Sequence, residues 1–262
     1  MPFRRETWHW PSAGWWLVVT ALAVLLKHHY SIASAADLEW MFRPLSLLLE
    51  GLTGHEFHRD DNFEWVSESA DVRLVKSCAG INFMLMSFVV YAWVARPDPE
   101  EDVGLWALIA AQLLLLTAAI TASWATCLLA NSLRIIVAMA AVSNGWELGV
   151  IGLDAAELHR VIGIVIYVPL LSLQMMLGNH TRIRDAFMAP VLLYLLLMII
   201  VPLLTGNALQ NPAMFTRHLL NILVMIAIIC SVYFITRIWH PQFEGYRLDK
   251  QEANVDNTTP TT

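Results

Sequence analysis

The sequence predicts an all-α polytopic membrane protein, with about six transmembrane helices, some re-entrant or surface helices and one small β-hairpin. Of its 262 residues, 57% are hydrophobic and 15% are charged, whereas soluble domains have about 45–50% apolar and about 25% charged residues. The apolar residues fall in blocks of about 17–25, the length that crosses a hydrocarbon core of roughly 30 Å. Lipid offers the backbone no hydrogen-bond partner, so these spans are expected to be helices.

The first apolar block, at about 15–27, follows Arg4 and Arg5. It lacks a clear small-x-small cleavage site, so we interpret it as a retained span rather than a removed signal peptide. Residues 37–52, DLEWMFRPLSLLLEGL, mix apolar and charged positions at near-helical spacing. This pattern predicts a helix lying at the membrane surface.

A polar segment, HEFHRDDNFEWVSESADVRLVKS, occupies 55–77. Its two halves, 57–66 and 71–76, show rough alternation of apolar and polar residues around turn-forming residues. We therefore expect a short β-hairpin that leads directly into Cys78.

Further apolar blocks follow as far as residue 238, and polar loops separate them. The blocks lie at about 79–95, 103–142, 160–177, 188–205 and 218–238. The tail, 249–262, is expected to be disordered. We expect a single membrane-embedded domain over 1–248.

The forty-residue block at 103–142 is predicted to cross the membrane once. The following loop, 143–158, has no Lys or Arg, and the positive-inside rule then places it outside the cell. The result is six crossings with both termini in the cytoplasm. A straight helix from Val103 to Arg134 would be about 48 Å long. Arg134 should therefore lie at or beyond the outer boundary, at the same depth as Cys78 and His159.

These three residue types suit thiol chemistry. A thiolate forms in a partly wet, electropositive setting. The His159 imidazole can hold the thiol proton, and the fixed charge of Arg134 can stabilise an anion that develops during reaction. Each residue also has an ordinary structural explanation: Cys78 as a small border residue, His159 as an interfacial side chain, and Arg134 as a cation that extends to the interface.

Three short motifs beside predicted spans carry a family resemblance. They are SCAGINF with Cys78-Ala79-Gly80, LLANSLRII with Asn131-Ser132-Leu133-Arg134-Ile135, and ELHRVIGIVIY with His159 and Gly163. In their order along the chain they resemble the motifs of the exosortase/archaeosortase family, which read Cys-Ala/Ser-Gly, Asn-x-x-Arg-Ile and His-x-x-x-Gly. The resemblance is clearest between residues 65 and 177.

The resemblance implies a membrane-embedded cysteine transpeptidase or protease that needs no cofactor. Its partners would be exported proteins with a C-terminal sorting signal, which combines a short motif, a transmembrane helix and a basic end. Cys78 would attack the scissile carbonyl, Arg134 would stabilise the oxyanion, His159 would act as general acid and base, and Asn131 would orient Arg134. The enzyme would lie in a bacterial cytoplasmic (inner) membrane, with its site facing out. The subgroup, the substrate motif and the acceptor stay open.

Two other functions remain open from the residues themselves. One is a small transporter or channel subunit that uses Arg134 and His159 as pathway residues. The other is an inactive scaffold of the same fold.

Other chemistry has little support in the sequence. The net charge of −6 and the lack of a basic cluster give no indication of nucleic-acid binding. HEFHRDD, at 55–61, is not HExxH, so we predict no metal site. Cys127 and Cys230 are interpreted as packing side chains, and His28 and His29 as interfacial residues.

Overall fold

The computed structural model describes residues 10–96, 104–144, 155–177 and 183–196, together with isolated positions between 199 and 231. The chain divides into two compact units, Met1–Gln210 and Asn211–Thr262. The elements and contacts below belong to the first unit. The tail expected to be disordered, 249–262, lies outside the described residues, so the predicted limits of the domain stay a prediction.

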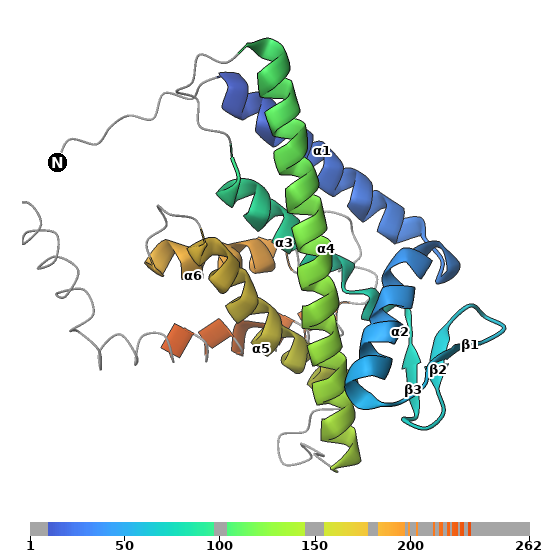
Figure 1. Cartoon of the computed structure of the whole chain (residues 1–262). Helices are drawn as coiled ribbons and strands as arrows, with labels where there is room; N and C mark the ends of the chain where they lie inside the picture. The colour runs from blue at the N-terminus through green and yellow to red at the C-terminus, as the bar shows by residue number, and fades with distance from the viewer. Residues whose placement is uncertain are drawn as a thin grey trace, which may run out of the picture. The chain divides into compact units, whose positions relative to one another are not determined.

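The first unit is mostly helical and contains one small sheet (Figure 1). In chain order its elements are α1 (Trp10–Ile32), η1 (Ala36–Leu38), α2 (Glu39–Thr53), β1 (His58–Arg59), β2 (Trp65–Ser67), β3 (Val72–Leu74), η2 (Lys76–Ala79), α3 (Ile81–Val94), α4 (Leu105–Ser143), α5 (Ala155–Met176) and α6 (Ile183–Leu195).

The prediction that the chain is mostly helical is confirmed, whereas the predicted number of membrane crossings stays a prediction. In the part of the chain that the structure describes, two helical segments are long and apolar enough to cross a membrane. They are Lys76–Val94, which joins η2 to α3, and Leu105–Ser143, which is α4. Most of the predicted outer loop, 143–158, lies outside the described residues.

The long apolar block forms one unbroken helix, α4, of 39 residues. At 1.5 Å per residue it is about 58 Å long, nearly twice the thickness of a hydrocarbon core. Large apolar side chains stand out from it: Trp106 is 82% exposed, Leu114 70% and Leu129 62%. Their exposure leaves an apolar surface that suits contact with lipid rather than water.

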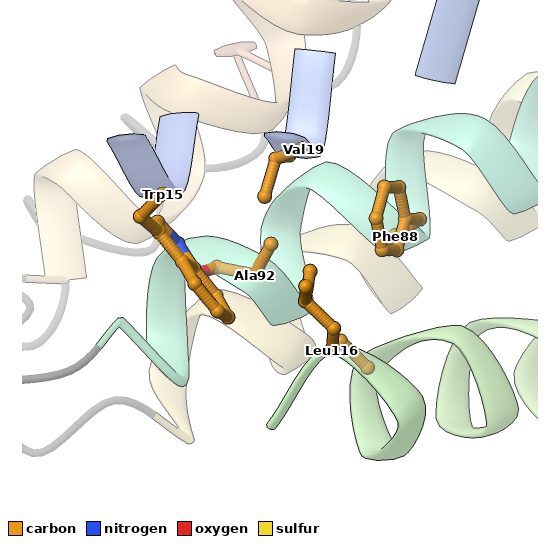
Figure 2. Close-up of a cluster of buried hydrophobic side chains, with 6 residues drawn as sticks. Trp15, Val19, Phe88, Ala92 and Leu116 are labelled. Atoms are coloured by element: carbon orange, nitrogen blue, oxygen red, sulfur yellow. The ribbon is translucent and has the colours of Figure 1, made fainter. Parts of the chain in front are cut away.

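Helix α3 is the central helix of the unit. It packs against α1, α4, α5 and α6, and most of its side chains are buried. A hydrophobic cluster near its C-terminal end is shared with α1 and α4 (Figure 2). Its buried members are Trp15, Val19, Phe88, Ala92, Leu116 and Ala119. The indole of Trp15 also donates a hydrogen bond to the Ala92 carbonyl at 3.2 Å. This packing leaves the N-terminal end of α3, beside Cys78, for other contacts.

The expected β-hairpin is instead a three-stranded antiparallel meander in the order β1-β2-β3. The first predicted half, 57–66, itself folds back on a turn at Phe63, whose φ is +62°. The Asp60 carboxylate stabilises that turn by accepting hydrogen bonds from the backbone N–H groups of Asn62 and Glu64, each at 2.9 Å. An alternating pattern does not reveal such a turn, because turn residues interrupt it only briefly. Strand β3 then leads into η2, as the sequence predicted.

The predicted surface helix is helical in the structure, as η1 followed by α2. Helix α2 buries one apolar face, at Met41, Phe42, Leu45 and Leu49, and packs against α4. It ends at Gly54, which has a left-handed φ of +75°.

Candidate active site

The turn of residues 76–80, called here the cysteine turn, lies between the sheet and α3. The backbone N–H of Cys78 donates to the Val75 carbonyl at 2.7 Å and closes the turn. Ser77 is exposed, whereas Cys78 and Ala79 are buried. Cys78 therefore lies at the border between the exposed turn and the buried interior.

The end of α1 holds the cysteine turn from one side. The Lys76 ammonium donates to the backbone carbonyls of Ser31, at 3.2 Å, and Ala33, at 2.7 Å. In return, the Tyr30 hydroxyl donates to the Lys76 carbonyl at 3.4 Å. Basic groups at a helix C-terminus satisfy carbonyls that have no partner within the helix.

Helix α4 holds the cysteine turn from the other side, through Asn131 and Arg134. The Asn131 side-chain N–H donates to the backbone carbonyl of Cys78. The Arg134 guanidinium donates to the Ser77 carbonyl at 3.4 Å. Both side chains are buried, and a spacing of three residues places them on the same face of a helix.

Gly80 is the point where the cysteine turn comes closest to α4. Its φ is +69°, a conformation that glycine adopts at little cost. A Cβ at this position would lie 3.0 Å from Cys127 Sγ and 3.2 Å from Asn131 Cγ. The Cys127 thiol donates to the Gly80 carbonyl at 3.3 Å and approaches that of Ala79 at 3.9 Å. Cys127 is fully buried and packs against the turn, in agreement with its predicted packing role.

Helix α5 brings His159 and Gly163 to Arg134. A Cβ on Gly163 would lie 3.4 Å from Arg134 Cδ, so the arginine side chain lies across the helix at this glycine. His159 lies within electrostatic range of Arg134. Its Nε2 atom is buried and has no hydrogen-bond partner among the described residues, and the same holds for Arg134 Nε. His159 Nε2 and Arg134 Nε are therefore each able to form a further hydrogen bond.

Tyr167 belongs to the same cluster, and the sequence prediction did not include it. Its hydroxyl donates to Asn131 Oδ1 at 3.0 Å. Its ring stacks on Phe83 with centroids 4.3 Å apart, and the Arg134 guanidinium lies 5.5 Å from its centre. A spacing of four residues, His159 to Gly163 to Tyr167, places all three on one face of a helix. That spacing was the signal available in the sequence.

The structure thus brings together six of the seven predicted site residues through direct contacts, and the seventh, His159, through its proximity to Arg134. The six are Cys78, Ala79, Gly80, Asn131, Arg134 and Gly163. Within the described ranges, no hydrogen bond joins the Cys78 thiol to the His159 imidazole, so the expectation that His159 holds the thiol proton stays a prediction.

The two histidines of the HEFHRDD segment contact other side chains. His55 contacts the Ser69 hydroxyl at 3.0 Å, and His58 lies 4.0 Å from Glu68. In the described part of the chain, no three His, Cys, Asp or Glu side chains are grouped as a metal ion would require.

No family model, curated protein or solved structure matches the chain.

Proposed function

We propose that the chain is a membrane-embedded cysteine transpeptidase or protease of the exosortase type, acting on the C-terminal sorting signals of exported proteins. The main observation behind the proposal is that side chains of α4 bind the backbone of the cysteine turn. Asn131 binds the Cys78 carbonyl, Arg134 binds the Ser77 carbonyl, and Gly163 of α5 accommodates the arginine side chain. The three motifs that carry the family resemblance therefore meet around one cysteine.

In the proposed reaction Cys78 is the nucleophile. Its sulfur attacks the scissile carbonyl carbon while the thiol proton passes to His159, and a tetrahedral intermediate forms. The intermediate collapses to a thioester as the peptide C–N bond breaks, and His159 returns the proton to the leaving amine. Water or an acceptor amine then attacks the thioester and releases the Cys78 thiol, which gives hydrolysis or transfer.

Arg134 would stabilise the oxyanion of each tetrahedral intermediate. Its guanidinium is buried, so its charge acts in a medium of low dielectric constant, where it is worth more than in water. Its Nε–H has no partner within the described ranges and is a donor that a developing anion can use. Its bond to Ser77 keeps the charge beside the cysteine.

The proposed setting is the cytoplasmic membrane of a bacterium, with six crossings, both termini in the cytoplasm and the site facing out. The exposed apolar side chains of α4 support a membrane setting. Its unbroken length of 39 residues supports a single crossing by that block.

A secreted reporter with a C-terminal tail tests the activity. The tail combines a randomised short motif, an apolar helix and a basic end, so the unknown motif is part of the search. We expect the wild-type chain to shorten a subset of these reporters and to form an adduct at Cys78 that hydroxylamine removes, as a thioester requires. Cys78→Ala should abolish both results. Cys78→Ser should be nearly as damaging, because a serine hydroxyl is far harder to ionise.

Cys127→Ala and Cys230→Ala are the matched controls, and both should process the reporter normally. If Cys127→Ala were as inactive as Cys78→Ala, with both proteins present in the membrane, the nucleophile would be wrongly assigned. Intact reporters throughout the library, with the wild-type chain inserted, would favour the inactive scaffold or the transporter.

A further inference from the structure

The further inference concerns Tyr167, a buried side chain to which the proposed mechanism assigns no role. Tyr167 is 6% exposed, and its hydroxyl donates to Asn131 Oδ1 at 3.0 Å. Its ring is held by Phe83 on α3 and by the Arg134 guanidinium on α4. Tyr167 therefore connects α5 to both helices beside the cysteine turn.

The hydroxyl of Tyr167 determines which way the Asn131 amide points. An asparagine amide has an accepting oxygen on one side and a donating NH₂ group on the other. The Cys78 carbonyl can only accept, so Asn131 reaches it only when the NH₂ group faces the turn. The oxygen then faces Tyr167, whose hydroxyl can donate to it. Without that hydroxyl, the oxygen would be buried with no donor, which disfavours this orientation.

We propose that Tyr167 is a positioning residue that acts through Asn131 on the cysteine turn. The Tyr167 hydroxyl keeps the Asn131 NH₂ group on the Cys78 carbonyl, and this contact fixes the backbone from which the Cys78 side chain projects. Its benefit to the reaction rests on the proposed function, whereas the contact itself can be measured without a substrate.

Tyr167→Phe is the informative variant, because it removes the hydroxyl and keeps the ring that packs on Phe83 and Arg134. Tyr91→Phe is its matched control. The Tyr91 hydroxyl also makes one bond between helices, at 3.0 Å from the Thr126 hydroxyl, and joins α3 to α4. The two variants therefore lose the same chemical group and a similar bond, but only Tyr167 contacts Asn131.

Selective isotope labelling can report on the Cys78 carbonyl alone. Among the three cysteines, Cys78 is the one followed by alanine. Labelling cysteine carbonyls with ¹³C and alanine amides with ¹⁵N therefore gives a single carbonyl-to-amide NMR signal, from the Cys78–Ala79 peptide. The full chain in detergent micelles is the sample, and circular dichroism checks its helical content.

We expect Tyr167→Phe to shift the Cys78 carbonyl resonance upfield, as the loss of a hydrogen bond does. Asn131→Ala should give the same shift, and the double variant should add nothing further. Tyr91→Phe should leave the resonance in place. A resonance that moves in Asn131→Ala but not in Tyr167→Phe would refute the proposal that Tyr167 acts on the cysteine turn through Asn131. A resonance that moves in neither would show that the contact with Asn131 does not hold the carbonyl.

The reporter assay then tests whether positioning serves the reaction. We expect Tyr167→Phe to lower kcat roughly tenfold, the factor that corresponds to one buried hydrogen bond, with little change in KM. Tyr91→Phe should keep the wild-type kcat. Unchanged kcat in Tyr167→Phe, together with a shifted resonance, would refute the positioning role. Failure of the wild-type chain to process any reporter would instead refute the proposed function, and the NMR result would stand on its own.

Discussion

Asn131 donates a side-chain hydrogen bond to the backbone carbonyl of Cys78, although 53 residues separate them along the chain. The bond joins α4 to the turn that precedes α3. A buried carbonyl without a partner would destabilise the turn, so the two motifs depend on each other for their local structure. This dependence makes the backbone around Cys78 the most informative place for substitutions.

Gly80→Ala should destabilise the protein and reduce its activity. An alanine at this position would keep the positive φ, which is unfavourable for a residue with a Cβ and costs about 1–2 kcal/mol. Its Cβ atom would also lie against Cys127 Sγ and Asn131 Cγ, and this overpacking adds a cost of about 1–3 kcal/mol. Thermal unfolding in detergent measures the loss of stability, and reporter processing measures the loss of activity.

Gly54→Ala is the matched control for Gly80→Ala. Gly54 also has a positive φ, but a Cβ there would have no neighbour within 4 Å. Gly54→Ala should lose only the stability that corresponds to the cost of the positive φ, and it should keep full activity. Equal losses of stability in the two variants would show that the close approach of Gly80 to α4 has no energetic consequence.

Arg134→Lys should lower the rate of reporter processing by about 10²–10³, the effect of removing one oxyanion donor. Lysine keeps the charge but loses the planar fork of donors. Arg73→Lys is the control, since Arg73 lies on the exposed sheet, where it pairs with Asp60 and Glu64. Full activity in Arg134→Lys would argue for a simple charge or anchoring role.

Leu116→Ala should destabilise the fold by about 2–5 kcal/mol, the range for leucine truncation in a packed core. Leu116 is 8% exposed and belongs to the cluster that joins α1, α3 and α4. Leu114, two residues earlier on the same helix, is 70% exposed, so Leu114→Ala should leave the Tm nearly unchanged. A similar fall in Tm for both variants, measured in detergent, would contradict the packing around α4.

If α4 crosses the membrane once, as we propose, its two ends should be accessible from opposite sides of the membrane. On a background without Cys78, Cys127 and Cys230, Asn144→Cys should react with an impermeant maleimide in intact cells. Gly104→Cys, at the other end of the helix, should react only after the membrane is permeabilised. The reverse pattern, or labelling of Asn144→Cys only after permeabilisation, would refute the one-crossing topology and the outward-facing site that depends on it.

The sequence alone determined the helical character of the chain, the β-structure before Cys78 and the identity of seven candidate site residues. These features are local: apolar block length, alternation of polar and apolar residues, and short motifs can all be read within a few turns of chain. Cys78, Asn131, Arg134 and His159 could therefore be named without coordinates.

Only the tertiary structure decided how these residues meet. The close approach of Gly80 to Cys127 and the hydrogen bond of Tyr167 to Asn131 both depend on contacts between distant segments. Such contacts follow from how far each helix is rotated about its axis when it packs. Composition and periodicity leave that rotation open for α3, α4 and α5, because helices with apolar residues on every side can pack through any face. The buried bonds among Tyr167, Asn131 and Cys78 are polar contacts that distinguish one rotation from the others.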